Sequence, residues 1–220
     1  DIATGKNRLI VSYDQVVKLE ALPTEVAQEK MWFNHVLFSR DSQRIFFMAR
    51  VKDANNRNVT AAFTVSTDGS ELRCILPYSW GASHFDWVND KELIITTKYQ
   101  GTEPWLHVRL TDGADKSTYT PLAQETLGSD GHLHASYDEQ WMVTDSYPSG
   151  PHRMRKLYLM NMDSQEIARV ASFHENKAYH REWRCDLHPR WSQDNKRICI
   201  DNTQDGTRQV YVIELDMPEE

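Results

Sequence analysis

The 220-residue chain lacks several features that would assign it to a familiar class. No apolar run approaches the roughly 18 residues needed to cross a bilayer, and the first residues, DIATGKNRL, lack the basic and apolar regions of a signal peptide. Three cysteines are too few and too odd in number for a disulfide framework, so they leave the redox compartment open. A net charge of -7 argues against a general nucleic-acid surface.

Motifs of several enzyme classes are also missing. The chain contains no glycine-rich phosphate loop, no G-x-S-x-G nucleophile elbow and no pair of C-x-x-C knuckles. Its composition, with 40% apolar and 26% charged residues, is that of a folded domain that can bury a substantial core. Disorder is therefore excluded, and the pattern along the chain has to indicate the fold.

A repeat organises the chain, in which a histidine is followed three residues later by an aromatic residue. The four copies are His35/Phe38, His84/Trp87, His134/Tyr137 and His188/Trp191, and the histidines are 49, 50 and 54 residues apart. An acidic turn, an apolar strand and a further strand with its own turn follow each copy. A period of roughly 40 to 50 residues with several short strands per unit is typical of propeller blades.

We therefore predict an all-β fold, a β-propeller of four-stranded antiparallel blades with about four blades present. The expected blades are residues 31–76, 80–122, 130–173 and 184–215 of a single domain, 1–220. Residues 1–12 are expected to form the outer strand of a preceding blade, and residues 13–30 a linker with at most one short helical turn. The last blade has only three strands, so the chain is either a closed four-bladed ring completed by its N-terminal strand or a piece of a larger propeller with open edges.

Three stretches carry a resemblance to a known family. They are SHFDW at 83–87, DGHLHASYDEQWMVTDSYP at 130–148 and RCDLHPRWSQDNKRICID at 184–201. They resemble bacterial propellers of the oligogalacturonate lyase type, to which ulvan lyases are similar, and the resemblance covers most of the chain from Trp32 onward. Members of that family are seven-bladed propellers that cleave uronic-acid polysaccharides by β-elimination. The resemblance implies a C-terminal fragment, with about three blades absent, of a periplasmic or cytoplasmic bacterial protein.

Elimination at a uronate needs a base for the C5 proton, an acid for the leaving oxygen, and a cation or metal for the carboxylate. In a propeller, the start of each inner strand and the loop between the second and third strands lie on the face near the central channel. We expect the catalytic residues there, and the candidates are His35, His84, His134, Tyr147 and Arg153. His152 of the same loop and Arg208 are expected to bind substrate.

The repeated histidines also have a structural interpretation, because a residue that recurs with the blade can simply hydrogen-bond the neighbouring blade. Tyr137 occupies the aromatic position of the repeat and is expected in the core. Tyr147 breaks the repeat and is the stronger candidate for acid–base chemistry.

A metal site is expected near the last blade. His174, His180, Cys185 and His188 lie within fifteen residues and offer nitrogen and sulfur ligands of the kind that zinc prefers. The lyases that the chain resembles contain a bound metal, so we expect His174, Cys185 and His188 to bind a divalent ion, with zinc favoured and manganese the alternative. Cys185 argues against ions that prefer oxygen, although a buried free thiol explains this cysteine equally well.

The predicted function is a polysaccharide lyase whose partner is a uronic-acid oligosaccharide or polysaccharide, with no nucleic acid and no membrane. Self-association through open blade edges is an additional expectation. The alternative is a non-catalytic propeller that binds a glycan or a protein, similar to TolB or WD40 scaffolds, because this architecture hosts many functions. Convergence of His84, His134, Tyr147 and Arg153 within about one sugar's width would favour catalysis, because proton transfer needs hydrogen-bond reach.

Overall fold

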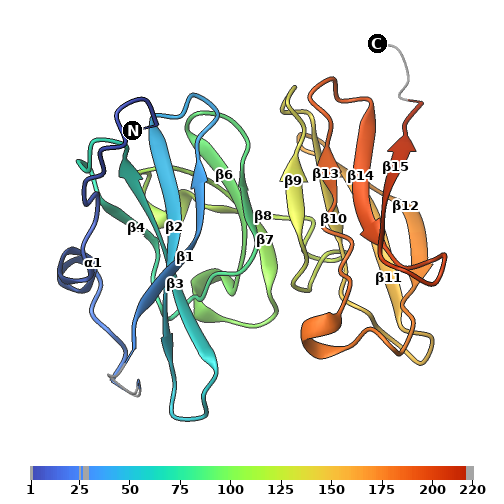
Figure 1. The fold of residues 1–220 in the computed structure, drawn as a ribbon, viewed down its shortest axis with the longest axis horizontal. Helices are drawn as coiled ribbons and strands as arrows, with labels where there is room; N and C mark the ends of the chain where they lie inside the picture. Colours follow the sequence, from blue (N-terminus) through green and yellow to red (C-terminus); the bar gives the residue numbers. More distant parts are fainter. Residues whose placement is uncertain (1, 25, 27–29, 217–220) are drawn as a thin grey trace. The chain divides into compact units, whose positions relative to one another are not determined.

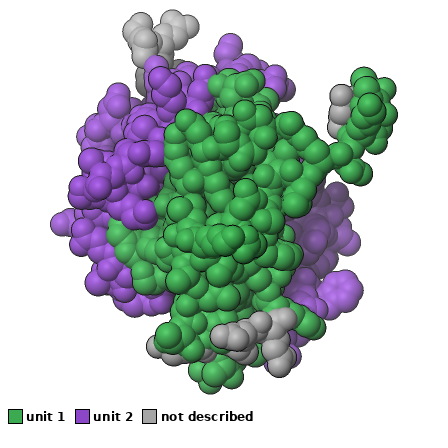
Figure 2. Space-filling view, turned by 90° about the vertical axis from the view of Figure 1, so that its left-hand side faces the viewer, with its two compact units in different colours: residues 1–82 green, residues 83–220 purple. Residues whose placement is uncertain are grey.

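The computed structural model describes residues 2–24, 26 and 30–216, and the regular secondary structure among them is almost entirely β-strand (Figure 1). The strands form four antiparallel sheets, three with four strands and one with three, and neighbouring strands follow each other in sequence. Sheets of this kind are propeller blades, so the predicted fold class is confirmed. The chain divides into two compact units, residues 1–82 with one blade and residues 83–220 with three, which Figure 2 colours separately.

The first unit contains one helix and one blade. Its elements are α1 (Tyr13–Leu19), β1 (Trp32–Phe38), β2 (Arg44–Lys52), β3 (Asn58–Ser66) and β4 (Arg73–Leu76). Ser12 and Gln15 form a capping box in which each side chain accepts the backbone N–H of the other, and this fixes the start of α1. Val16 of the helix packs into a core with Phe47 and Phe63 of the sheet.

The segment before the helix differs from the prediction. Residues 2–12 form a turn followed by irregular structure, so the strand expected at residues 1–12 is wrong for the residues that the structure describes, and residue 1 lies outside them. Arg8 nevertheless binds this segment to the blade, because its Nη2 donates to the carbonyl of Thr67 at 2.8 Å. The helical turn expected in the linker is present as α1.

The second unit contains three blades in succession. The first comprises β5 (Phe85–Trp87), β6 (Glu92–Thr97), β7 (Leu106–Thr111) and β8 (Thr120–Leu122), with 3-10 turns η1 (Tyr99–Gly101) and η2 (Lys116–Thr118) in its loops. The second comprises β9 (Leu133–Ala135), β10 (Trp141–Asp145), β11 (Met154–Asn161) and β12 (Ile167–His174). The third comprises β13 (Arg190–Trp191), β14 (Arg197–Asn202) and β15 (Gln209–Glu214), preceded by η3 (Arg181–Trp183).

The three blades pack face to face through two apolar layers, and strand β11 shows why. Successive side chains of a strand point to opposite faces, so Leu157 and Leu159 enter the layer shared with the β13 blade, whereas Met160 enters the layer shared with the β5 blade. The first strands of successive blades in this unit are in contact, since β9 contacts both β5 and β13, and Figure 1 shows β9 beside β13. Residues at the start of these strands are therefore brought together.

Turns of the same kind set the register after three of the first strands. Ser39, Ser136 and Ser192 each donate a hydrogen bond from Oγ to the aspartate two residues later, at 2.5 to 2.6 Å. The same hydroxyl accepts the backbone N–H of the residue five positions later. This local network is the physical basis of the acidic turn seen in the repeat.

The last blade exposes one edge. Strand β15 is the outer strand of the three-stranded sheet, and Val210 and Val212 on it are 64% and 61% exposed. No helix among the described residues is long and apolar enough to cross a membrane.

Candidate functional site

Three histidines of the second unit lie in a row, one at the start of each blade. His84 directly precedes β5, His132 precedes β9, and His188 lies two residues before β13. The ring centroids of His84 and His132 are 4.0 Å apart, as are those of His132 and His188. We call these three residues the histidine row.

The row consists of structurally equivalent residues. In each blade the histidine lies three residues before the last residue of the first strand. That last residue pairs with the second strand: Trp87 pairs with Leu93, Ala135 with Met142, and Trp191 with Ile198. The predicted pairing of His134 with Tyr137 is therefore shifted by two residues, because His132 is the repeat histidine of its blade. Tyr137 falls in the following turn, where it is 42% exposed and not in the core as expected.

His84 is held between a carboxylate and a phenol. Its Nδ1 lies 3.0 Å from Asp130 Oδ1, and its Nε2 lies 3.4 Å from the hydroxyl of Tyr147. Because the ionised carboxylate can only accept, Nδ1 carries a proton, and Nε2 faces the hydroxyl of Tyr147. Burial alone would raise the pKa of Asp130, but its hydrogen bond to His84, the charge of that ring and the hydroxyl of Ser83 lower it overall. The aspartate therefore stays charged and orients the imidazole.

His132 is oriented by Asp145, the last residue of β10. Gly131 passes so close to the backbone of Asp145 that a Cβ would lie 2.1 Å from its carbonyl oxygen, so only glycine fits there. The backbone N–H of His132 then donates to Asp145 Oδ1 at 2.8 Å, and His132 Nδ1 lies 3.0 Å from both carboxylate oxygens. Burial lowers the pKa of His132, but the hydrogen bond and charge of Asp145 and the charge of Asp186 raise it overall.

His188 completes the row on its other side, with 48% of its side chain accessible. Its backbone N–H donates to Asp145 Oδ2 at 3.2 Å, and its Nδ1 lies 3.6 Å from Asp201 Oδ2. Burial and the neighbouring His132 together lower the pKa of His188. A neutral imidazole is the form that binds metal ions.

One group of side chains in the described part of the chain could hold a metal ion. It consists of His132, Asp186 and His188, whose ligand atoms all lie within 4.8 Å of one another. The carboxylate behind His132 fits this role, because metal-binding histidines usually donate their second ring N–H to such a group. Two imidazoles and one carboxylate suit several divalent transition metals, including manganese and zinc.

An arginine that the sequence reasoning did not single out joins Asp186 to Tyr147. Arg184 Nε and Nη2 donate to the two oxygens of Asp186 at 2.5 and 2.8 Å. Its guanidinium carbon lies 4.4 Å from the centre of the Tyr147 ring. Burial raises the pKa of Tyr147, the charges of Asp130 and Asp186 raise it further, and Arg184 only partly offsets them. Tyr147 therefore remains a phenol rather than a phenolate near neutral pH.

The two predicted substrate-binding residues lie elsewhere in the second unit. Arg208, in the turn between β14 and β15, donates from Nη2 to the carbonyls of Trp183 and Arg184 at 3.1 and 3.0 Å. It thus supports the loop that carries Arg184. His152 is exposed in the turn between β10 and β11.

Two of the predicted catalytic histidines are outside the row. His134 lies within β9, and its Nδ1 accepts the backbone N–H of Trp191 at 3.4 Å, so it bonds the next blade as the structural interpretation expects. The nearby Asp86 accepts the N–H of Ala135 at 2.9 Å. His35 belongs to the first unit, where it is exposed at a bulge of β1 with a φ of 54°.

Arg153 and the predicted metal ligands His174 and Cys185 belong to a different cluster. Arg153 Nη2 is paired with the fully buried carboxylate of Glu175, which also accepts the backbone N–H of Cys185 at 3.3 Å. The carbonyls of His174 and Cys185 accept hydrogen bonds from the buried Arg155. Of the predicted metal ligands, His188 belongs to the one candidate ligand group found among the described residues, and His174 and Cys185 do not.

The site residues that sequence reasoning missed are Asp130, His132, Asp145, Arg184 and Asp186. His132 had a usable signal, because the Ser-x-Asp turn begins four residues after His35 and His188 and also four residues after His132. The other four lie in the stretches that carry the family resemblance, but no spacing rule distinguishes them from ordinary loop residues.

Comparison with known proteins gives structural neighbours only. No protein-family model matches the chain, and no curated protein matches it in sequence. Among solved structures, it is similar to an oligogalacturonate lyase in complex with manganese, with a TM-score of 0.63 and 20% identity over 84% of this chain and 48% of that one. An oligogalacturonate lyase from Vibrio parahaemolyticus gives a TM-score of 0.63 and 14% identity over 83% of this chain and 49% of that one.

A protein with a different name is also similar. TolB from Acinetobacter baumannii gives a TM-score of 0.56 and 10% identity over 82% of this chain and 54% of that protein. The chain thus spans about half the length of the solved structures it matches. At these identities, the likeness supports a β-propeller relationship and leaves the activity to be argued from the site.

Proposed function

We propose that the second unit carries the active site of a lyase that cleaves uronic-acid saccharides by β-elimination. One observation carries the proposal: the hydrogen-bonded series Asp130–His84–Tyr147 lies against a group of metal-ligand side chains and an arginine. A base, an acid and cationic groups for a carboxylate are the three requirements of this reaction. The likeness to two oligogalacturonate lyases supports the same assignment.

His84 is suited to be the base. With Nδ1 bonded to Asp130, its Nε2 can accept the proton from C5 of the uronate. The electron pair of the C5–H bond then forms the C4–C5 double bond, and the bond from C4 to the glycosidic oxygen breaks. Asp130 stabilises the imidazolium that results, as a buried carboxylate does behind other catalytic histidines.

Tyr147 is suited to be the acid. Its raised pKa keeps the hydroxyl protonated, and the leaving oxygen needs a proton as the C4–O bond breaks. The hydroxyl lies 3.4 Å from His84 Nε2, so the proton gained by the histidine can return to the tyrosine for the next turnover.

Arg184 is suited to bind the uronate carboxylate. Two of its N–H groups are committed to Asp186, which fixes the plane of the guanidinium beside the Tyr147 ring, and the remaining N–H groups can donate to substrate. Loss of the C5 proton places negative charge on this carboxylate, so a fixed cation there stabilises the transition state more than the ground state.

A divalent metal would be held by His132, Asp186 and His188. When bound, such an ion supplies positive charge that stabilises the enolate-like charge on the uronate. The donor set contains two nitrogens and an oxygen and no sulfur, so the earlier reason for preferring zinc, the thiol of Cys185, does not apply. We therefore favour manganese, and one of the similar lyases is a manganese complex.

The experiment follows the ultraviolet absorbance of unsaturated uronate products when the complete protein, supplied with Mn²⁺, is mixed with oligogalacturonides or ulvan. We expect absorbance to rise with at least one substrate, and to fail to rise with Tyr147→Phe. A folded, manganese-supplied protein that generates no unsaturated product from any uronate polymer would contradict the proposal. That result would favour the alternative, a non-catalytic glycan- or protein-binding propeller, which the similarity to TolB supports.

A further inference from the structure

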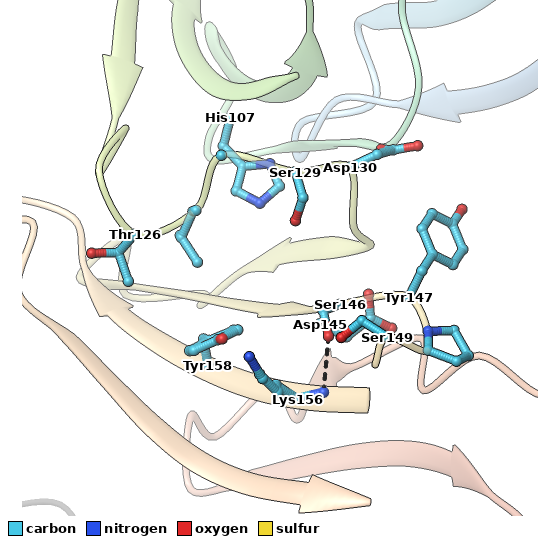
Figure 3. A pocket seen from close by; sticks show the side chains of 13 residues that line it. His107, Thr126, Ser129, Asp130, Asp145, Ser146, Tyr147, Ser149, Lys156 and Tyr158 are labelled. Atoms are coloured by element: carbon cyan, nitrogen blue, oxygen red, sulfur yellow. Dashed lines mark hydrogen bonds between the residues drawn. The ribbon is translucent and has the colours of Figure 1, made fainter. Parts of the chain in front are cut away.

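A cavity of about 420 Å³ lies beside the histidine row, within the second unit (Figure 3). Its walls are the loop at residues 126–130, the segment 145–149 that follows β10, and two side chains of β11. The volume falls within the range of about 300 to 1,000 Å³ that is usual for small-molecule sites. Asp130 and Tyr147 line the cavity and also contact His84 of the histidine row. The cavity is therefore continuous with the proposed active site around that row, which we call the histidine site.

One cation in this cavity is not used by the protein. Lys156 lines it from β11, and its ammonium group forms no ion pair in the part of the chain that the structure describes. Its backbone is fixed, because the N–H donates to Ser146 Oγ at 3.0 Å and the carbonyl accepts the Ser146 N–H at 3.0 Å. Lys156 and Tyr158 both line the cavity from β11 (Figure 3).

Neither of the two acidic groups of the cavity forms an ion pair with Lys156. Both oxygens of Asp130 are bonded to Ser83 and His84, and both oxygens of Asp145 are bonded to His132. In Figure 3 Asp130 is directed away from Lys156. A ligand that enters the cavity at the Lys156 end therefore meets an unpaired positive charge.

The remaining polar groups suit a sugar. Ser129 and Tyr158 present hydroxyls on opposite walls (Figure 3), and Pro148 adds an apolar surface next to Tyr147. Hydroxyls next to a small apolar face are the groups that bind the hydroxyls and the C–H face of a pyranose ring.

We propose that this cavity is a second sugar subsite, in which Lys156 binds the carboxylate of the acidic sugar next to the one that occupies the histidine site. This inference rests on the proposed function and narrows it. The substrate would be a saccharide with at least two neighbouring acidic sugars, and an isolated uronate among neutral sugars would bind more weakly.

The test measures binding by calorimetry with the full chain in a His84→Gln background, so that the saccharide is not cleaved. The probes are trigalacturonate and the neutral trisaccharide of galactose. We expect Lys156→Met to weaken trigalacturonate binding about tenfold, because a charge-assisted hydrogen bond is lost, and to leave the neutral trisaccharide unaffected. Lys156→Arg should restore most of the affinity, and Lys196→Met, at an exposed turn lysine, should behave like the parent.

A second measurement does not depend on the folding of a variant. Trigalacturonate should slow the acetylation of Lys156 by an amine-reactive reagent, read by mass spectrometry, while Lys196 reacts at its former rate. Equal affinity of Lys156→Met and the parent for trigalacturonate, or no protection of Lys156, would overturn the subsite. If Lys156 is protected but the complete protein yields no unsaturated product, the subsite stands and the lyase proposal fails.

Discussion

Two polar clusters of the second unit use similar side chains in different ways. Around Glu175, Arg153 pairs with the carboxylate and Arg155 donates to two carbonyls and to Asn202, so charges are matched by the protein itself. In the histidine row, Asp130 and Asp145 are each bonded to one imidazole, while His84 Nε2 faces Tyr147, and His132 and His188 offer ligand atoms that lie within 4.8 Å of each other. The difference separates a cluster that stabilises the fold from one with bonding capacity left for a ligand.

The comparison also explains why an arginine or a histidine in a loop is weak evidence of catalysis. Arg153 directly precedes β11 and Arg184 directly follows η3, but Arg153 meets a carboxylate with 0% of its side chain exposed, whereas Arg184 meets one beside the proposed base and acid. Residue type is the same in the two clusters, and the neighbours decide the role.

The largest effect should follow a change in the histidine row. His84→Ala should slow product formation by the complete protein about a thousandfold, since general-base catalysis contributes on the order of 10² to 10⁴. Initial rates of ultraviolet absorbance measure this, with His152→Ala, an exposed turn histidine, as the matched control. If both variants lose the same activity, the row has no special role.

The structural cluster should respond through stability. Glu175→Gln removes the buried charge that pairs with Arg153, whose side chain is 31% exposed, and loss of this charge-assisted hydrogen bond should lower the free energy of unfolding by about 2 kcal/mol. Urea denaturation provides the measurement, and Glu182→Gln, at an exposed position of η3, should change it by less than about 0.5 kcal/mol. A Glu175→Gln protein of unchanged stability would show that the cluster is not what stabilises this part of the blade.

The buried His107 should make the stability of the protein depend on pH. His107 is buried between Thr96 and Thr144, and burial lowers its pKa from 6.5 to about 4, with the neighbouring charges of Asp130 and His84 making smaller changes. The unfolded chain therefore binds a proton between these values that the folded chain does not, so stability is full above pH 6.5 and falls as the pH approaches 4.

The loss through His107 should reach about 3 kcal/mol at the acidic end of this range, at 1.36 kcal/mol per pKa unit. Urea midpoints at several pH values would measure it, and His107→Gln should have a flatter profile. A profile of the same steepness in that variant would assign the pH dependence to other groups.

A smaller effect, on the affinity for Mn²⁺, is expected from a change of Asp145, which is hydrogen-bonded to His132. Asp145→Asn keeps the shape of the side chain but removes the charge that orients and polarises the imidazole, so the affinity for Mn²⁺ should fall about 10- to 100-fold. Competition with a metal-sensitive dye measures the affinity, and Asp163→Asn, in an exposed turn, is the control. An unchanged affinity would mean that Asp145 serves only to anchor the backbone at His132.

The fold could be predicted from the sequence because its determinants are local and repeated. Alternating apolar strands, acidic turns and a regular period specify blades, and the sheets span Trp32–Leu76, Phe85–Leu122, Leu133–His174 and Arg190–Glu214. The segment before α1 was mispredicted, since a glycine-containing turn next to apolar residues is also compatible with irregular chain that packs on a blade.

The site could be predicted only in part. His84, Tyr147 and His188 were found because they stand at strand starts or in the loop after β10, where a propeller gathers side chains. His132 was missed because the repeat position of its blade, three residues later, is occupied by Ala135 and not by an aromatic residue. The aromatic Tyr137 lies two residues further on and made His134 look like the repeat histidine. Asp130 and Asp186 were missed because their partners come from other parts of the chain, and such pairings depend on the blade packing rather than on any local pattern.

The most direct test of the account compares two histidines that are two residues apart. Calorimetric titration of Mn²⁺ into the full chain should show one site that is lost in His132→Ala and retained in His134→Ala, because only His132 has its ligand atom near those of Asp186 and His188. Retention of the site in His132→Ala, or its loss in His134→Ala alone, would contradict the claim that the histidine row forms the functional site.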